Sequence, residues 1–84
     1  MNQTTTDLRT KILQVLSDVS AVPVDDIEDE HELAADLGMD SVALMELRGM
    51  LDEEFGIELE LEHAQRTDDV GKVMAVVSEQ LRVH

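Results

Sequence analysis

The chain has 84 residues, of which 20 are acidic and six are Lys or Arg, so its formal charge at neutral pH is −14. A chain of this length supports one small core, and we assign residues 1–84 to a single domain. The acidic balance disfavours nucleic-acid binding, and the absence of cysteine excludes disulfides and cysteine-based metal sites. Because no apolar run reaches membrane-spanning length and no signal-peptide pattern is present, we expect a cytoplasmic protein without a membrane span.

A first helix is predicted from about residue 6 to residue 19. Its N-cap candidates are Thr4 to Thr6, and Pro23 prevents any helical continuation. Apolar residues recur at helical spacing and form one buried stripe: Leu8, Ile12, Val15, Leu16 and Val19.

A long first loop follows, over residues 20–40, with six acidic residues before Leu33. We expect an ordered crossover with a short helical turn near residues 25–27. Four isolated apolar residues anchor it: Val22, Ile27, Leu33 and Leu37. The acids do not form a calcium loop, because no Asp-x-Asp-x-Asp-Gly spacing with a closing Glu is present.

A second helix is predicted from Ser41 to Phe55. Gly38 suits a turn before it, Asp40 suits the N-cap, and Gly56 suits a left-handed C-terminal cap. This register puts Ser41 at the first helical position, with its hydroxyl facing outward.

After Gly56, the chain alternates Ile57 and Leu59 with glutamates and is expected to return in an extended form. A short helical turn is predicted over residues 60–66, with Leu61 and Ala64 facing inward. A last helix follows, capped by Thr67, Asp68 or Asp69, with Arg82 near its C-terminal end. Its predicted buried stripe is Val70, Val73, Met74, Val77 and Leu81. The fold class is therefore all-α: a small four-helix bundle of three longer helices and one short helix, with a long first loop.

The second helix has two apolar sets on different sides. At 100° per residue, the core side is formed by Leu44, Leu47, Leu51 and Phe55. A second side carries an apolar patch with an acidic rim, and we predict that it binds partners: Val42, Met45, Glu46, Gly49, Asp52 and Glu53.

The stretch around the start of this helix resembles the attachment motif of acyl carrier proteins, with Val42 in place of the usual Leu. The matching residues are Leu37, Gly38, Asp40, Ser41, Glu46 and Leu47. The resemblance covers residues 4–82 and implies that Ser41 carries 4′-phosphopantetheine, transferred from coenzyme A, whose thiol holds acyl chains as thioesters. It also implies that Asp40 contacts the magnesium ion used in that transfer.

The expected partners are a phosphopantetheinyl transferase and acyltransferase-, ketosynthase- and reductase-type enzymes with basic docking patches. We expect a monomeric carrier. It is not expected to be an enzyme, because no His or Lys neighbours Ser41 in the sequence to act as a base. His31, His63 and His84 are too scattered to suggest a zinc site, and no metal site is predicted.

The pathway is left open between fatty acid and polyketide biosynthesis. Residues 53–57 resemble fatty-acid carriers, whereas residues 46–51 resemble polyketide carriers. Arg48 and Gly49 replace larger apolar residues of the fatty-acid type, which favours a specialised pathway, and the ends of the chain suggest a discrete protein. Two alternatives are an aminoacyl or peptidyl carrier and a small acidic helical interaction protein without a prosthetic group.

Overall fold

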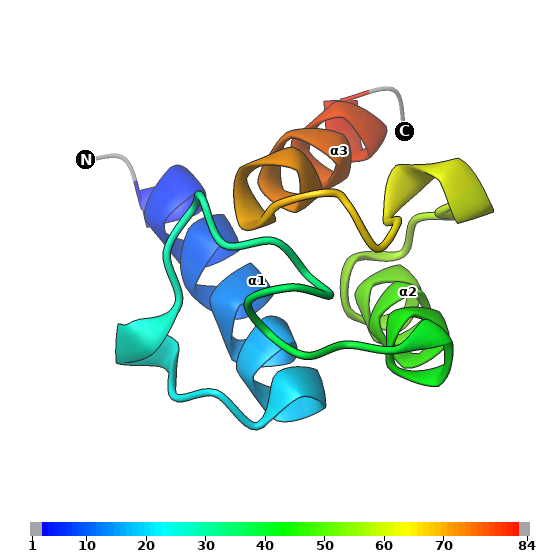
Figure 1. Cartoon of the computed structure of the whole chain (residues 1–84). Helices are drawn as coiled ribbons and strands as arrows, with labels where there is room; N and C mark the ends of the chain where they lie inside the picture. The colour runs from blue at the N-terminus through cyan, green and yellow to red at the C-terminus, as the bar shows by residue number, and fades with distance from the viewer. Residues whose placement is uncertain (1–2, 83–84) are drawn as a thin grey trace.

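The computed structural model describes residues 3–82, and within that range the chain forms three α-helices. They are α1 (Gln3–Ser20), α2 (Ser41–Phe55) and α3 (Val70–Arg82) (Figure 1). Two single turns of 3-10 helix complete the fold, η1 (Val24–Asp26) and η2 (Leu61–His63). The predicted all-α bundle is confirmed, but the fourth short helix is not, because η2 is only one 3-10 turn.

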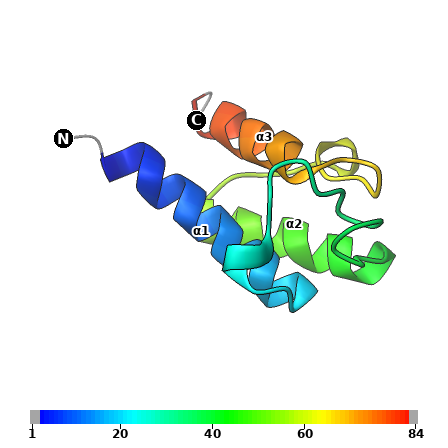
Figure 2. The same ribbon diagram turned by 60° about the vertical axis from the view of Figure 1, so that its left-hand side comes forward.

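The helices surround a core made almost entirely of aliphatic side chains. α1 packs against α2, and α3 lies above α2 in both views (Figures 1 and 2). The core is formed by Ile12, Val15, Leu16, Ile27, Leu33, Leu37, Met39, Leu44, Leu47, Leu51, Ile57, Ala64, Val70, Val73 and Val77. No helix within residues 3–82 is both long and apolar enough to span a membrane.

α1 is longer than predicted at both ends. It begins at Gln3, before the capping candidates Thr4 to Thr6, and it ends at Ser20. The next residue, Ala21, has a left-handed backbone (φ 67°), and its N–H donates to the Ser17 carbonyl oxygen at 2.8 Å. The helix therefore ends through a left-handed cap two residues before Pro23.

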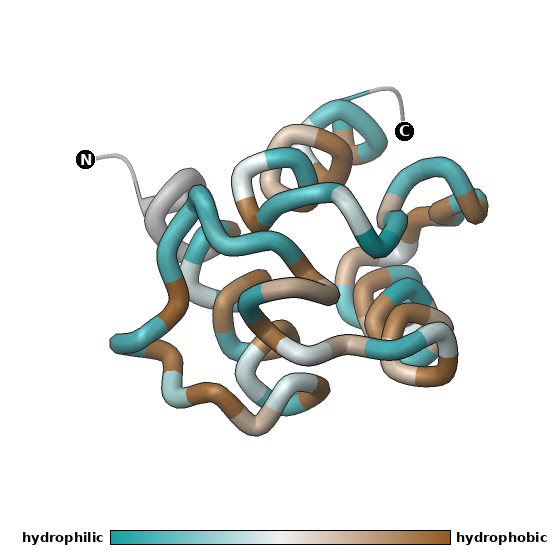
Figure 3. The backbone as a smooth tube through the Cα atoms, in the orientation of Figure 1, coloured by the Kyte–Doolittle hydropathy of each residue, from teal (hydrophilic) through white to brown (hydrophobic). Residues whose placement is uncertain are grey.

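The first loop, residues 21–40, is ordered by buried anchors and by backbone hydrogen bonds to distant segments. Ile27, Leu33 and Leu37 are buried as predicted. The Leu33 N–H donates to the Asp68 carbonyl oxygen at 2.9 Å, and Glu32 forms an isolated antiparallel bridge with Asp69. Figure 3 shows that most of the loop is hydrophilic, with short hydrophobic segments between the hydrophilic ones.

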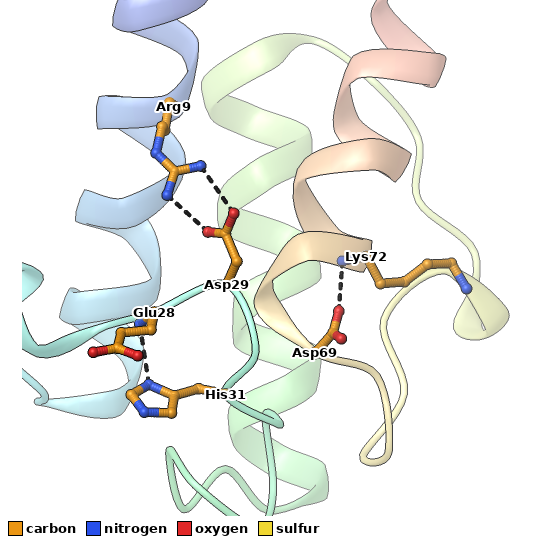
Figure 4. A network of polar contacts seen from close by, with 6 residues as sticks. All are labelled: Arg9, Glu28, Asp29, His31, Asp69 and Lys72. Atoms are coloured by element: carbon orange, nitrogen blue, oxygen red, sulfur yellow. Dashed lines mark hydrogen bonds and ion pairs between the residues drawn. The ribbon is translucent and has the colours of Figure 1, made fainter.

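An ion pair also ties the first loop to α1 (Figure 4). Asp29 Oδ1 lies 2.7 Å from Arg9 Nη2, and the Asp29 carbonyl oxygen accepts from the Gly71 N–H at the start of α3. One short segment of the loop is thus joined to two helices, which positions the crossover relative to both.

Two residues that were predicted to face the core are exposed instead. Leu61 is 72% exposed, because it begins the single turn η2, in which no residue is buried; Ala64, which follows η2, is buried as predicted. Leu81 is 37% exposed near the end of α3, where Val76 is buried instead. Of the three predicted caps for α3, Asp69 is the one used, since its Oδ1 accepts from the Lys72 N–H at 2.8 Å (Figure 4).

Candidate functional site

Ser41 is the first residue of α2, and its side chain is exposed. Asp40 is the N-cap, as predicted: its backbone is extended and its Oδ1 accepts from the Ala43 N–H at 2.8 Å. At the other end, Gly56 caps the helix with φ 65°, which confirms the predicted left-handed cap. Both helix ends are therefore fixed by short-range interactions.

The turn before Ser41 is held rigidly by the core and by backbone hydrogen bonds. Gly38 has φ 71°, a conformation that glycine adopts without the cost a side chain adds. Its neighbours Leu37 and Met39 point into the core, with only 5% and 2% exposure. The Met39 N–H also donates to the Leu33 carbonyl oxygen at 2.9 Å. Ser41 is thus an exposed residue at the end of a fixed turn, and the burial of Met39 was not predicted.

The start of α2 favours an anion near Ser41. The N-terminal N–H groups of a 15-residue helix carry partial positive charge, and the Asp40 side chain accepts from that of Ala43. A phosphate ester on the serine oxygen would lie at this positive end.

One side of α2 is exposed beside Ser41, as predicted. Val42 and Met45 are each 63% exposed, although both are apolar. Glu46 and Glu53 are also exposed, as is Gly49. We call these five residues the outer face of α2.

Asp52, which was predicted on the same rim, has a structural contact. It is half-buried, and its Oδ1 accepts from the Leu59 N–H at 2.9 Å. This bond holds the return segment after α2. The contact joins residues seven positions apart across a turn, so helical periodicity could not reveal it.

A groove of about 340 Å³ opens next to Ser41, between α2 and the η2 segment. We call it the Ser41 groove. Its lining residues are Ser41, Leu44, Met45, Arg48, Leu61, Ala64, Gln65 and Arg66. Arg48 bridges its two sides, because its Nη1 donates to the Ala64 carbonyl oxygen at 2.8 Å. No local sequence pattern predicts the groove, since the bond that joins its two sides links residues 16 positions apart.

The two histidines that the structure describes take part in local turns. His31 Nδ1 accepts from the Glu28 N–H at 3.0 Å (Figure 4), and His63 Nδ1 accepts from the Glu60 N–H at 2.8 Å. The third, His84, lies outside the described residues. Across residues 3–82, no three or more His, Cys, Asp or Glu side chains gather in a metal-binding arrangement.

Comparison with known protein families adds an independent observation. Residues 10–77 match the family described as "Phosphopantetheine attachment site". The match includes the turn, α2, η2 and the first part of α3, and it therefore contains Ser41 and both sides of the Ser41 groove.

Individual relatives share the same name. The acyl carrier protein of Saccharopolyspora erythraea is 39% identical over 64 residues, which are 76% of this chain and 67% of that protein. The acyl carrier protein of Nitratidesulfovibrio vulgaris strain Miyazaki F is 34% identical over 67 residues, covering 80% and 88% of the two chains. That of Clostridium acetobutylicum is 34% identical over 64 residues, covering 76% and 83%.

Proposed function

This chain belongs to the acyl carrier protein family with its phosphopantetheine attachment site, and from that premise we propose that Ser41 is the attachment residue. The protein is a carrier and not an enzyme, and 4′-phosphopantetheine is its prosthetic group. The observation that carries the proposal is the exposed serine at the start of α2, held by a rigid turn within the matched segment.

The chemistry of the prosthetic group suits these residues. The arm supplies a thiol, which the sequence itself cannot provide because it contains no cysteine. Its phosphodiester would lie at the N-terminus of α2, where backbone N–H groups favour an anion. The exposure of Ser41 leaves its hydroxyl accessible to a separate transferase.

The outer face of α2 is the proposed docking surface for that transferase and for acyltransferase-, ketosynthase- and reductase-type enzymes. Val42 and Met45 supply apolar contact area within about one turn of Ser41. Glu46 and Glu53 supply negative charge, which would orient partners with basic patches and increase their rate of encounter. Asp52 contributes charge from a position fixed by its bond to Leu59.

For the pathway, we propose polyketide or another specialised acyl pathway in preference to general fatty acid synthesis. The supporting observation is Arg48, whose Nη1 donates to the Ala64 carbonyl oxygen in the Ser41 groove, at a position where the resemblance to fatty-acid carriers implies an apolar residue. We further propose that the chain acts as a single monomeric domain in the cytoplasm. An aminoacyl carrier is the remaining carrier alternative.

The attachment residue is tested by intact-mass spectrometry after incubation with coenzyme A, magnesium and a promiscuous phosphopantetheinyl transferase. We expect one phosphopantetheine on the wild-type chain and none on Ser41→Ala, which keeps the Asp40 cap and should remain folded. Modification of Ser41→Ala would refute the assignment. An unmodified wild-type chain would instead favour the interaction protein without a prosthetic group.

Asp40 is proposed to contact magnesium during the transfer, in addition to capping α2. Asp40→Asn separates the two roles, because asparagine caps helices about as well as aspartate but carries no charge. We expect an unchanged melting temperature and slower loading, with a higher magnesium requirement. Equal loading rates at limiting magnesium would assign Asp40 to capping alone.

A further inference from the structure

Methionine supplies all the sulfur in this chain before the arm is attached. The sequence contains five methionines but no cysteine, tryptophan or tyrosine. A peroxide converts the methionine thioether to a sulfoxide, which is polar and which dedicated reductases convert back. Because no cysteine thiol competes for the oxidant, the exposure of each methionine decides where this oxidation occurs.

The four methionines that the structure describes differ in their surroundings. Met45 is 63% exposed and lies outside the core cluster, whereas Met39 is 2% exposed within it. Met50 and Met74 are half-buried and pack against the core. Met45 is therefore the most exposed methionine among residues 3–82.

Met45 also occupies a position where its polarity matters for docking. It lies four residues after Ser41 in α2, and positions i and i+4 share one side of a helix. Val42 and Met45 are the two large apolar side chains of the outer face of α2, and both are exposed. A sulfoxide at Met45 would therefore make one of these two apolar contacts polar.

The fold should tolerate an added oxygen at Met45 but not at Met39. The Met45 side chain faces solvent, so its sulfoxide oxygen keeps its hydrogen bonds to water. A sulfoxide at Met39 would instead bury a polar oxygen among aliphatic side chains, which costs free energy. Oxidation confined to Met45 thus changes the surface of α2 and leaves the core intact.

We propose that Met45 is a redox-sensitive site, at which a peroxide oxidises the thioether to a sulfoxide and thereby weakens the docking of partner enzymes. This inference rests on the proposed docking surface and adds a means of regulating it. In the reaction, a lone pair of the sulfur attacks the peroxide, the O–O bond breaks and an S–O bond forms. The sulfur is oxidised by two electrons, and the peroxide is reduced to water or an alcohol.

The selectivity of oxidation is tested first, on the chain without its arm. The chain is treated with hydrogen peroxide at neutral pH, and tandem mass spectrometry of its proteolytic peptides follows each methionine over time. We expect Met45 to be oxidised severalfold faster than Met50 and Met74, with Met39 the slowest. Circular dichroism should show unchanged helices while Met45 sulfoxide is the main product.

Docking is measured next, by isothermal titration calorimetry with the transferase after the peroxide has been removed. The Kd should increase roughly fivefold or more, because the sulfoxide removes apolar contact and its oxygen must lose water on binding. Methionine sulfoxide reductases of both types together reduce both sulfoxide epimers, and their action should return the Kd to its starting value.

Matched variants are each compared with themselves before and after peroxide. In Met45→Leu, peroxide should leave the Kd unchanged, whatever the starting Kd of the variant, because leucine has no sulfur to oxidise. Met74→Leu on α3 keeps Met45 and should respond to peroxide as the wild type does. Met45→Gln introduces a polar side chain without any oxidant and should weaken docking.

Three outcomes would overturn the proposal. Equal oxidation rates at Met45 and Met74 would remove the selectivity. A Kd that still increases in peroxide-treated Met45→Leu would assign the effect to another methionine. An unchanged Kd at full oxidation of Met45, while Met45→Gln docks more weakly, would show that the sulfoxide does not disturb docking. If untreated Met45→Gln instead docks as tightly as the wild type, the docking surface on which this inference rests is refuted.

Discussion

The two sides of α2 show how one helix can serve a core and a surface. On one side, Leu44, Leu47 and Leu51 are at most 4% exposed, whereas on the other Val42 and Met45 are each 63% exposed. Hydrophobicity does not distinguish the two sets. The difference is that α1 and the first loop cover one side, while the other side adjoins Ser41 and remains in solvent.

The buried side should dominate stability. Leu47 is completely buried, so Leu47→Ala leaves a cavity and should lower the free energy of unfolding by about 2–5 kcal/mol. Urea denaturation followed by circular dichroism measures this loss. An unfolding free energy equal to that of the wild type would show that the sides have been assigned the wrong way round.

Much of this arrangement follows from local sequence signals. The bounds of α2 were predicted correctly, because an aspartate cap and a glycine that adopts positive φ mark its ends within one turn. The buried leucines of α2 follow from helical spacing alone.

Other features depend on tertiary contacts and could not be predicted. Leu61 has no helical repeat around it, because η2 is three residues long. The Ser41 groove requires Arg48 to meet Ala64, and the role of Asp52 requires the chain to turn back at Leu59. The spacing in the sequence between Arg48 and Ala64, or between Asp52 and Leu59, matches no helical or strand repeat that would predict a contact.

The exposed side should dominate docking. Met45→Ala removes contact area without opening a cavity, so we expect about 1 kcal/mol weaker docking, or roughly a fivefold higher Kd for the transferase. Isothermal titration calorimetry measures this Kd. Met74→Ala on α3 is the control for loss of a methionine. If Met45→Ala unfolds the chain, its side chain belongs to the core.

The acidic rim should have the smallest effect. Glu46→Lys should reduce kcat/KM for loading roughly twofold at low salt, because exposed charges act mainly on the rate of encounter. The loss should decrease as salt is added. Glu30→Lys, in the first loop, changes the net charge equally, and an equal loss there would point to total charge instead of the rim.

The methionine methyl groups provide the most direct test of the two-sided helix. A chain labelled with [¹³C-methyl]methionine carries probes at exposed Met45, buried Met39, and half-buried Met50 and Met74. On titration with the transferase, we predict that the Met45 signal shifts first and most, while the Met74 signal stays unchanged. Changes at Met50 or Met74 with an unaffected Met45 signal would contradict docking on the outer face of α2.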